Sequence, residues 1–344
     1  MYFNNSFLKS LFSSPDPKSP LQKDEFVNGN TINGGLIALF LDRNVTCANN
    51  TLNSPNAQGI FLSLPSYDVT IKNNIILNSI STAITVKLQT DHKDENNEPL
   101  LDDSYRSSGI LIVGNKIENA RNHGIAVNNL TYSVIKDNVV NSTDFNGIYL
   151  LQSDHLLVTK NQVTNAALVL AEAKETLYPG WRTAWDSGIY VDAFVSDSII
   201  SLNTINSTND LMQWGIAVNH GVENNNSENN VYWNHFSGLF KHQKVHVAPN
   251  TNNYQFNNDI AERTGNGIWL QIIGDGTVMV DGVVYNKSTY IEFNEIGTHI
   301  IKAIADEGSQ FITWEEDIEC REFVCSIDNT TLLDVIVIFR KAKE

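Results

Sequence analysis

Basic residues are scarce in this chain of 344 amino acids, which has 23 Lys and Arg against 39 Asp and Glu and a formal net charge of −16. No cluster of Lys or Arg stands out along the sequence. Because such a surface repels nucleic-acid phosphates, the charge argues against sequence-independent binding of DNA or RNA. The same repulsion acts on polyanionic sugars, so a polyuronate ligand would need a local basic pocket or a bridging Ca²⁺ ion.

Long apolar runs and cysteine pairs are scarce as well. No run of about 18 apolar residues occurs, so we expect no membrane-spanning helix. Of the 3 cysteines, Cys320 and Cys325 enclose four residues, which suits a disulfide across a hairpin in an oxidising compartment. Further ligands at zinc spacing are missing, so the cysteine pair does not predict a zinc site. Cys47 is left over, and we expect it to be a buried structural thiol.

The sequence does contain a repeat. A Gly-Ile pair recurs along the first three-quarters of the chain and is followed 14 or 15 residues later by an asparagine. The pairs begin at Gly59, Gly124, Gly147, Gly188 and Gly215, and the matching asparagines are Asn74, Asn138, Asn161, Asn203 and Asn230. From Asn115 to Asn138 to Asn161 the period is 23 residues. A period in the twenties, made of short β-branched runs, is typical of a solenoid.

In each unit, aliphatic residues alternate over only a few positions, as in Ile125-Ala126-Val127, which is the period of a strand. Three short strands per coil would stack equivalent positions about 4.8 Å apart along the axis. Asparagine, of which the chain has 44, tolerates left-handed backbone angles and can bond to itself along such a stack. The pattern therefore predicts an all-β protein built on a parallel β-helix.

The Gly-Ile-x-Val and Asn-Asn-x-Ile phrases resemble the repeats of right-handed parallel β-helix proteins. Pectate-lyase-like enzymes, alginate epimerases, phage tailspikes and periplasmic β-helix proteins have this fold. The resemblance covers residues 26 to 260, roughly, and implies a right-handed helix. It does not imply one activity, because these repeats host several chemistries and some members have none.

We divide the chain into three parts. Within residues 1–25, residues 1–14 have apolar side chains at roughly helical spacing but no basic start or cleavage site, and a Pro-rich stretch follows, so we expect a capping helix and a linker rather than a signal peptide. Residues 26–262 are predicted to form the β-helix. Residues 263–344, where the asparagine phrase has stopped, are predicted to form a small β-rich domain.

This last part resembles the internalin B-repeat-like module of bacterial surface and secreted proteins. The resemblance rests on the Gly-Thr-Val opening at Gly276, the phrase Gly308, Phe311 and Trp314, the nearby cysteine pair and a closing strand at residues 335–339. A further cysteine pair near the start of that module is missing. The resemblance implies a spacer or attachment module without catalysis.

Two insertions interrupt the repeat, and inserted loops are where a repetitive scaffold usually carries its function. Residues 88–107 contain several carboxylates that could bind Ca²⁺, although they lack an ordered ligand spacing and a solvated acidic loop is the simpler interpretation. Residues 166–187 contain Tyr178, Trp181 and Trp185. Aromatic faces recognise sugar rings, but these side chains could equally cover apolar surface of the coil.

Residues that alternate with the inward Ile and Val should face outward and form a stripe beside both insertions. The stripe and the insertions together supply the candidate substrate-binding residues Lys87, Tyr149, Tyr178, Trp181, Trp185, Tyr190, Trp214 and Asn219.

Asp192, His220 and Arg182 are the candidate catalytic residues. In a polysaccharide lyase, His220 or a tyrosine would be the base, and Arg182 or Lys87 would hold the uronate carboxylate. A hydrolase needs two carboxylates, and Asp186 with Asp192 is the nearest pair on this face. We expect His123 and His155 to be corner residues of the repeat rather than catalysts.

The catalytic phrases of enzymes built on such repeats are absent. The chain has no Asp-Pro-His of the alginate epimerases, no Trp-x-Asp-His of the pectate lyases and no Asn-Thr-Asp of the polygalacturonases. Two hypotheses therefore stand. One is an extracytoplasmic carbohydrate-active protein, lyase-like or hydrolase-like, and the other is a non-catalytic glycan-binding or adhesive surface or tailspike-type protein. In both, the expected partner is a polysaccharide or surface glycan.

Overall fold

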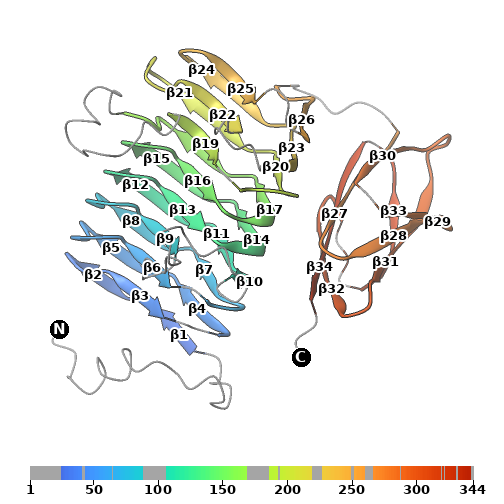
Figure 1. Ribbon diagram of the computed structural model, residues 1–344, viewed down its shortest axis with the longest axis horizontal. Helices are drawn as coiled ribbons and strands as arrows, with labels where there is room; N and C mark the ends of the chain where they lie inside the picture. Colours follow the sequence, from blue (N-terminus) through green and yellow to red (C-terminus); the bar gives the residue numbers. More distant parts are fainter. Residues whose placement is uncertain are drawn as a thin grey trace, which may run out of the picture.

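The computed structural model describes residues 25–40, 43–63, 65–87, 106–168, 186–192, 194–218, 227–248, 252–259, 266–286, 288–318, 320, 322–330 and 332–341. Every regular element in these ranges is a strand, and no helix there is long and apolar enough to cross a membrane. The capping helix predicted at the N-terminus and the boundary predicted at residue 262 fall on residues outside these ranges. A long stack of strands has a second group of strands beside it (Figure 1).

The stack consists of three parallel sheets that wind around one axis. Sheet A contains β1 (Glu25–Asn28), β4 (Val45–Ala48), β7 (Thr70–Lys72), β10 (Ser107–Ser108), β11 (Leu111–Val113), β14 (Leu130–Lys136), β17 (Asp154–Thr159), β20 (Ile199–Ser201), β23 (Ser227–Tyr232) and β26 (Asn252–Phe256). Sheet B contains β2 (Thr31–Asn33), β5 (Thr51–Asn53), β8 (Ile75–Leu77), β12 (Lys116–Ala120), β15 (Val139–Thr143), β18 (Gln162–Thr164), β21 (Thr204–Ser207) and β24 (His235–Gly238). Sheet C contains β3 (Ile37–Phe40), β6 (Ile60–Ser63), β9 (Ile84–Lys87), β13 (Ile125–Asn128), β16 (Ile148–Leu151), β19 (Ser187–Val191), β22 (Trp214–Val218) and β25 (Gln243–Val247).

Equivalent residues of successive coils lie directly above one another. On the inner face of sheet C, the register aligns the fully buried residues Ile60, Ile84, Ile125, Ile148, Ile189 and Ile216. These side chains join the inner rows of sheets A and B in one apolar core, which also holds the buried thiol of Cys47. The fold is a right-handed parallel β-helix, as the repeat predicted.

The glycine of each Gly-Ile pair lies at the start of a sheet C strand, where space is lacking. A Cβ atom on Gly124 would lie 2.4 Å from Cγ1 of Val140 and 2.7 Å from the carbonyl oxygen of Gly147 on the next coil. On Gly147 the same atom would lie 2.4 Å from Cγ1 of Val163 and 2.7 Å from the carbonyl oxygen of Gly188. Because one neighbour in each case is backbone of the following coil, it cannot easily move aside, so Gly124 and Gly147 have no room for a side chain.

A column of asparagines runs up the turn between sheets A and B. The Nδ2 atom of Asn138 donates to Oδ1 of Asn161 and to the carbonyl of Ile112, both at 2.9 Å. Its Oδ1 atom accepts from the backbone N–H and the Nδ2 of Asn115, both at 3.0 Å. The same amide-to-amide bond links Asn30, Asn50, Asn74, Asn115, Asn138, Asn161, Asn203, Asn234 and Asn258. Each coil thus satisfies the buried polar groups of the next.

The column differs from the predicted one in two details. The repeat assigned Asn230 to the column, but Asn230 lies on β23. Asn234, which is 31 residues after Asn203, takes its place in the column. The left-handed backbone angle belongs to the residue before each column member, such as Asn73 with φ 52° and Asp137 with φ 55°. At each turn, one residue therefore adopts the left-handed backbone angle and the next residue makes the amide-to-amide bond.

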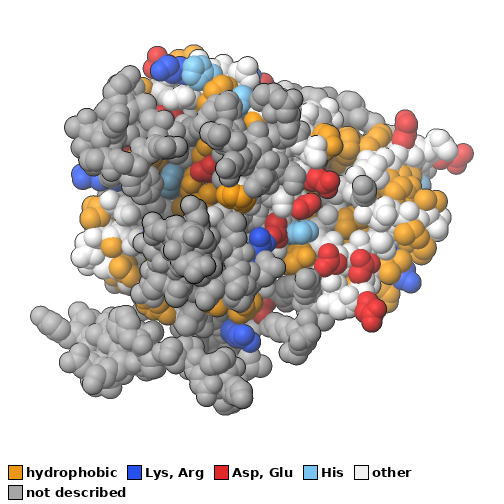
Figure 2. Space-filling model, in the orientation of Figure 1, with side chains coloured by type: hydrophobic (Ala, Val, Ile, Leu, Met, Phe, Trp, Pro, Cys, Tyr) orange, Lys and Arg blue, Asp and Glu red, His pale blue; other side chains and the backbone are white. Residues whose placement is uncertain are grey.

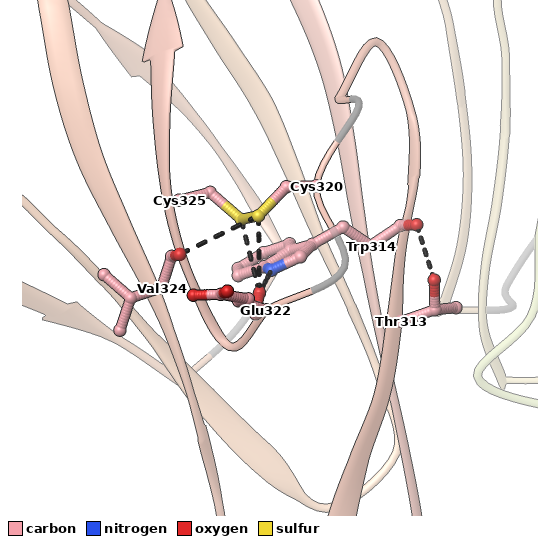
Figure 3. The surroundings of a disulfide bond; sticks show 6 residues. All are labelled: Thr313, Trp314, Cys320, Glu322, Val324 and Cys325. Atoms are coloured by element: carbon pink, nitrogen blue, oxygen red, sulfur yellow. Dashed lines mark hydrogen bonds between the residues drawn. A yellow bond between two sulfur atoms is a disulfide. The ribbon is translucent and has the colours of Figure 1, made fainter.

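The C-terminal strands form two four-stranded sheets. Sheet D contains, in order, β30 (Thr289–Glu292), β27 (Gly267–Ile273), β34 (Leu333–Lys341) and β32 (Ser309–Glu316). Sheet E contains β29 (Val283–Tyr285), β28 (Gly276–Val280), β31 (Thr298–Ala305) and β33 (Val324–Asp328). Side chains of both sheets form a core of their own. Beside it, Cys320 and Cys325 form a disulfide, and Nε1 of the buried Trp314 donates to the carbonyl of Glu322 at 2.8 Å (Figure 3).

The C-terminal sheets pack on the outer face of sheet A. Strand β34 is buried on both sides, because Ile336 and Ile338 point away from its own core and pack with Leu157, Ile199 and Trp233 of the β-helix. The outer face of sheet A is apolar at this place and polar beyond it. Its column of aligned residues reads Thr46, Thr70, Leu111, Val134, Leu157, Ile199 and Asn230.

Removing one amide from the asparagine column should destabilise the fold strongly. The Asn138→Ala variant loses four buried hydrogen bonds and leaves their partners unsatisfied, so we expect the free energy of unfolding to fall by about 3–5 kcal/mol. Asn53→Ala is the matched control, because the Nδ2 of Asn53 also donates to an asparagine of a neighbouring coil, Asn33, at 2.9 Å, but in an exposed position. It should cost less than about 1 kcal/mol in urea unfolding. Equal losses in the two variants would contradict the role given to the buried column.

Candidate functional site

The outer face of sheet C carries a column of side chains parallel to the helix axis. The strand register aligns Ala38, Phe61, Thr85, Ala126, Tyr149, Tyr190, Ala217 and His246. Because the residues before and after each of them belong to the core, this column faces outward. Tyr149 and Tyr190 are 41 residues apart in sequence, and they lie on adjacent coils.

Asp192 follows β19 directly and lies beside both tyrosines. The hydroxyl of Tyr149 donates to Oδ2 of Asp192 at 2.6 Å, and the hydroxyl of Tyr190 bonds to the same carboxylate. The ring of His123 stacks on that of Tyr149, with 4.6 Å between centroids and 9° between planes. The Tyr149 and Tyr190 rings lie 5.9 Å apart. We call His123, Tyr149, Tyr190 and Asp192 the tyrosine–aspartate cluster.

The cluster is more enclosed than the sequence predicted. Tyr190 and His123 are each 3% exposed and Tyr149 is half-buried, so the expectation of two tyrosines facing open solvent is wrong for Tyr190. His123 comes from the coil before Tyr149 and Tyr190 from the coil after it, so their rings lie on opposite sides of the Tyr149 ring. The two rings cover part of the Tyr149 ring, which leaves little of its face for a sugar to stack on.

Burial, together with the charge and the hydrogen bonds of Asp192, raises the pKa of Tyr149 and of Tyr190 far above the ordinary value for tyrosine, about 10. Both phenols therefore stay protonated at neutral pH and act as donors to the carboxylate. A phenol with so high a pKa is a poor general base. The cluster thus disfavours the tyrosine base considered for a lyase.

A second group of rings lies at the other end of the same strands. Trp214 begins β22, and its ring centroid lies 4.8 Å from that of His242 and 4.6 Å from that of His246. Trp214 is aligned with Ser187, three residues before Tyr190, which corresponds to about 10 Å along the strand. Because its ring contacts that of His246, which faces outward, Trp214 lies on the outer side of sheet C.

The predicted carboxylate pair Asp186 and Asp192 is wrong. Asp186 precedes β19 and Asp192 follows it, which separates them by about 20 Å at the usual rise of a strand. The two carboxylates of a glycosidase lie about 5–10 Å apart. Asp186 is instead buried, accepts from Nε2 of Gln213 at 3.3 Å, and its carbonyl accepts from the backbone N–H of Trp214. These contacts hold the start of β22 against β19.

The other predicted residues are only partly described. Lys87 ends β9, is exposed, and lies on the same edge of sheet C as Asp192, three coils or about 14 Å away. The acidic stretch 88–105 falls outside the described residues, and within the described ranges no group of three or more His, Cys, Asp or Glu is placed to hold a metal ion. Also outside the described residues are Arg182, His220, Tyr178, Trp181, Trp185 and Asn219.

Two members of this face escaped the sequence reasoning. His123 occupies the corner expected for it, immediately before Gly124, but its ring also stacks on Tyr149. His246 lies in the last coil of sheet C, where Lys244 stands in the register position of the repeated glycine Gly215. The alternation of Val245 and Val247 around His246 was the signal that could have revealed the strand.

Comparisons with known proteins agree with this architecture. Residues 102–270 match the family model of the right-handed beta helix region. The match spans sheet strands from β10 to β26 and ends within β27, which belongs to sheet D. Among curated proteins, none matches this chain in sequence.

Several solved structures are similar to this chain. The A-module of mannuronan C-5 epimerase AlgE6 from Azotobacter vinelandii has 12% identity and a TM-score of 0.49, and the alignment covers 68% of this chain and 58% of that one. The alginate lyase from Paenibacillus sp. str. FPU-7 has 14% identity and a TM-score of 0.38, with 68% and 75% covered. PfbA, a surface adhesin of Streptococcus pneumoniae, has 13% identity and a TM-score of 0.39, with 93% and 81% covered. This chain thus spans less than two thirds of the epimerase module.

The raised pKa values of the cluster should weaken the fold at alkaline pH. An unfolded tyrosine ionises near pH 10, whereas Tyr149 and Tyr190 stay protonated to higher pH in the folded state. Above about pH 10 the unfolded state loses these protons first, so the free energy of unfolding should fall by up to about 1.4 kcal/mol per pH unit for each tyrosine. Urea unfolding between about pH 9 and pH 11 should show a shallower fall in Tyr149→Phe and in Tyr190→Phe. If the free energy of unfolding fell as steeply with pH in both variants as in the wild type, the raised pKa values assigned to the two tyrosines would be contradicted.

Proposed function

We propose that this chain is an extracytoplasmic carbohydrate-active β-helix protein that binds a glycan along the outer face of sheet C. The observation that carries the proposal is the Asp192 carboxylate, which two protonated phenols orient at the edge of an outward column of rings. Aromatic side chains combined with a few fixed polar groups are the usual means of sugar recognition. The ring group of Trp214, His242 and His246 extends the same face by two coils.

In this proposal Asp192 is the catalytic carboxylate and Tyr149 and Tyr190 position it. Both phenols donate to its oxygens, so the carboxylate acts here as an acceptor held in one orientation, which suits a nucleophile or a general base. His220 would exchange a proton with the glycan, and Arg182 would neutralise charge that develops in the transition state. Lys87 and Trp214 would contact sugar residues further along the axis. Whether the reaction is hydrolysis or elimination depends on which side chain faces Asp192 across the bound glycan.

Some features support the rival hypothesis of a non-catalytic glycan-binding or adhesive surface protein. Asp186, the expected second carboxylate, lies at the far end of β19. The C-terminal sheets are also held firmly against sheet A through the apolar contacts of β34, which suits a rigid rod that presents a binding surface. In that case the outer face of sheet C would bind a surface glycan and leave it unchanged.

The extracytoplasmic location is part of the same proposal. The disulfide between Cys320 and Cys325 supports it, because structural disulfides persist in oxidising compartments and are rare in the cytosol. The small number of basic residues and the net charge of −16 fit a secreted or surface protein that must stay soluble. A polysaccharide or surface glycan is the expected partner, and the B-repeat likeness of the C-terminal sheets would make them an attachment module.

A screen of neutral and anionic polysaccharides for reducing ends and for unsaturated products tests the proposal. We expect the wild type to degrade at least one substrate and Asp192→Asn to lower the rate by at least about 100-fold, since proton transfer or nucleophilic attack by this carboxylate would be lost. His220→Ala should lower the rate as well. Asp137→Asn is the matched control, because Asp137 is exposed at the turn between sheets A and B.

Two other outcomes would contradict the catalytic proposal. Products formed at the wild-type rate by Asp192→Asn would remove Asp192 from the site. If no polysaccharide is cleaved but one is bound, and Asp192→Asn weakens this binding, the rival adhesive function is favoured. Binding should be measured on the same polysaccharides, so that the two functions are compared on one set of ligands.

A further inference from the structure

A groove separates the β-helix from the C-terminal sheets next to the place where they touch. It has a volume of about 240 Å³ and lies between the outer face of sheet A and the strands β32 and β34. These strands lie beside sheet A in Figure 1. The groove is therefore on a different side of the β-helix from the tyrosine–aspartate cluster, which belongs to sheet C.

Two local features open the groove. The corner positions Asp68, Gly109 and Tyr132 follow one another on successive coils, all with left-handed backbone angles, and Gly109 has no side chain to fill the space between its neighbours. On the opposite wall, the pairing of β32 with β34 is interrupted between Phe311 and Thr313. Ile312 consequently bulges from the strand and is 39% exposed. Bulges of this kind often lie next to functional sites.

The groove combines an apolar floor with a polar rim. Leu111, Val134 and Ile312 provide the floor. At the rim, the carboxylate of Asp68 can only accept hydrogen bonds when ionised. The hydroxyl of Thr313 donates to the carbonyl of Trp314 at 2.8 Å, so its remaining capacity is mainly that of an acceptor.

Tyr132 gives the rim the same character. Tyr132 lines the groove, and its hydroxyl bonds to Asp275, so the phenol oxygen keeps the capacity to accept a hydrogen bond. Its ring packs against that of His155, with 4.6 Å between centroids, which fixes its position. The rim therefore favours a ligand that offers several donors around an apolar surface.

Charge and size narrow the ligand further. Asp68 and Asp275 lie near the groove, and Arg106, which lies near Tyr132, is paired with Asp154. Acidic side chains are spread over the C-terminal strands in Figure 2, and the chain as a whole carries −16, so anions are disfavoured. The volume is below the range of about 300–1,000 Å³ that is common for larger ligands. A single sugar ring has hydroxyl donors at its edge and apolar C–H groups on its faces.

The geometry points to this groove as a second glycan-binding site, which takes one neutral or amino-bearing sugar ring and rejects a uronate. The site is independent of the proposed function, because none of its residues belongs to sheet C. The hydroxyl groups of the sugar would donate to Asp68, Thr313 and Tyr132. The C–H face of the sugar ring would lie on Leu111 and Val134. An amino group would gain an ion pair with Asp68.

Ligand-observed NMR on the full chain with glucose, glucosamine and glucuronic acid tests this site. The three probes share one ring and differ in charge. We expect glucosamine and glucose to bind and glucuronic acid to bind at least about 10-fold more weakly. Ile312→Trp fills the groove and should weaken glucose binding at least 10-fold, whereas Ile300→Trp, a matched control at a residue that is 47% exposed on sheet E, should leave it unchanged.

Asp68→Asn is a second variant that leaves the shape of the groove unaltered. It should abolish the preference for glucosamine over glucose. Asp192→Ala separates the two glycan sites, because it should leave the binding of all three probes as in the wild type. The inference is overturned if none of the probes binds, if Ile312→Trp binds glucose like the wild type, or if binding is lost in Asp192→Ala instead.

Discussion

The fold depends on the amide-to-amide bond between asparagines of successive coils. This bond forms only if the next coil lies in register at the spacing of paired strands, about 4.8 Å. The chain length between successive members nevertheless varies from 20 residues, between Asn30 and Asn50, to 42, between Asn161 and Asn203. The column therefore fixes one corner of every coil, and the differences in length must be taken up elsewhere. Loops of any length can then be added without disturbing the apolar core.

This constraint explains how residues far apart in sequence meet on sheet C. Tyr149 and Asp192 are 43 residues apart, yet they are neighbours because the asparagine column and the repeated glycine set both coils in register. The stacked rings of His123, Tyr149 and Tyr190 then leave the Asp192 carboxylate few alternative positions. A site built in this way is rigid before any ligand arrives, which is a property of effective binding and catalytic sites.

The sequence predicted the features that repeat and failed where the repeat changes. The Gly-Ile pairs predicted the inner rows, because the exclusion of a Cβ atom recurs at each repeated glycine, as at Gly124. The repeat indicates Asn230 instead of Asn234 because Asn230 keeps the lag of 14 or 15 residues from the repeated glycine, whereas Asn234 follows Gly215 by 19 residues. The separation of Asp186 from Asp192 could have been predicted from strand geometry alone, since they flank one strand. The stacking on Tyr149 could not, because it depends on the angle of each ring.

The contact with the C-terminal sheets is visible in the sequence, but the period of the repeat alone does not reveal it. In Leu156-Leu157-Val158 the apolar residues do not alternate with polar ones, because Leu157 packs against sheet D while Val158 faces the core of the β-helix. A strand that is apolar on both sides must be covered on both sides. Such runs in a solenoid indicate the coils on which another unit rests, and here they occur in β17 and β20.

A crystal structure of the full chain soaked with mixed neutral and anionic oligosaccharides tests the central claim most directly. The account predicts density for a sugar chain along the outer face of sheet C, with a hydroxyl or anomeric carbon within contact distance of the Asp192 carboxylate. Oligosaccharide density confined to sheet B, or a sugar on sheet C that leaves Asp192 untouched, would contradict it.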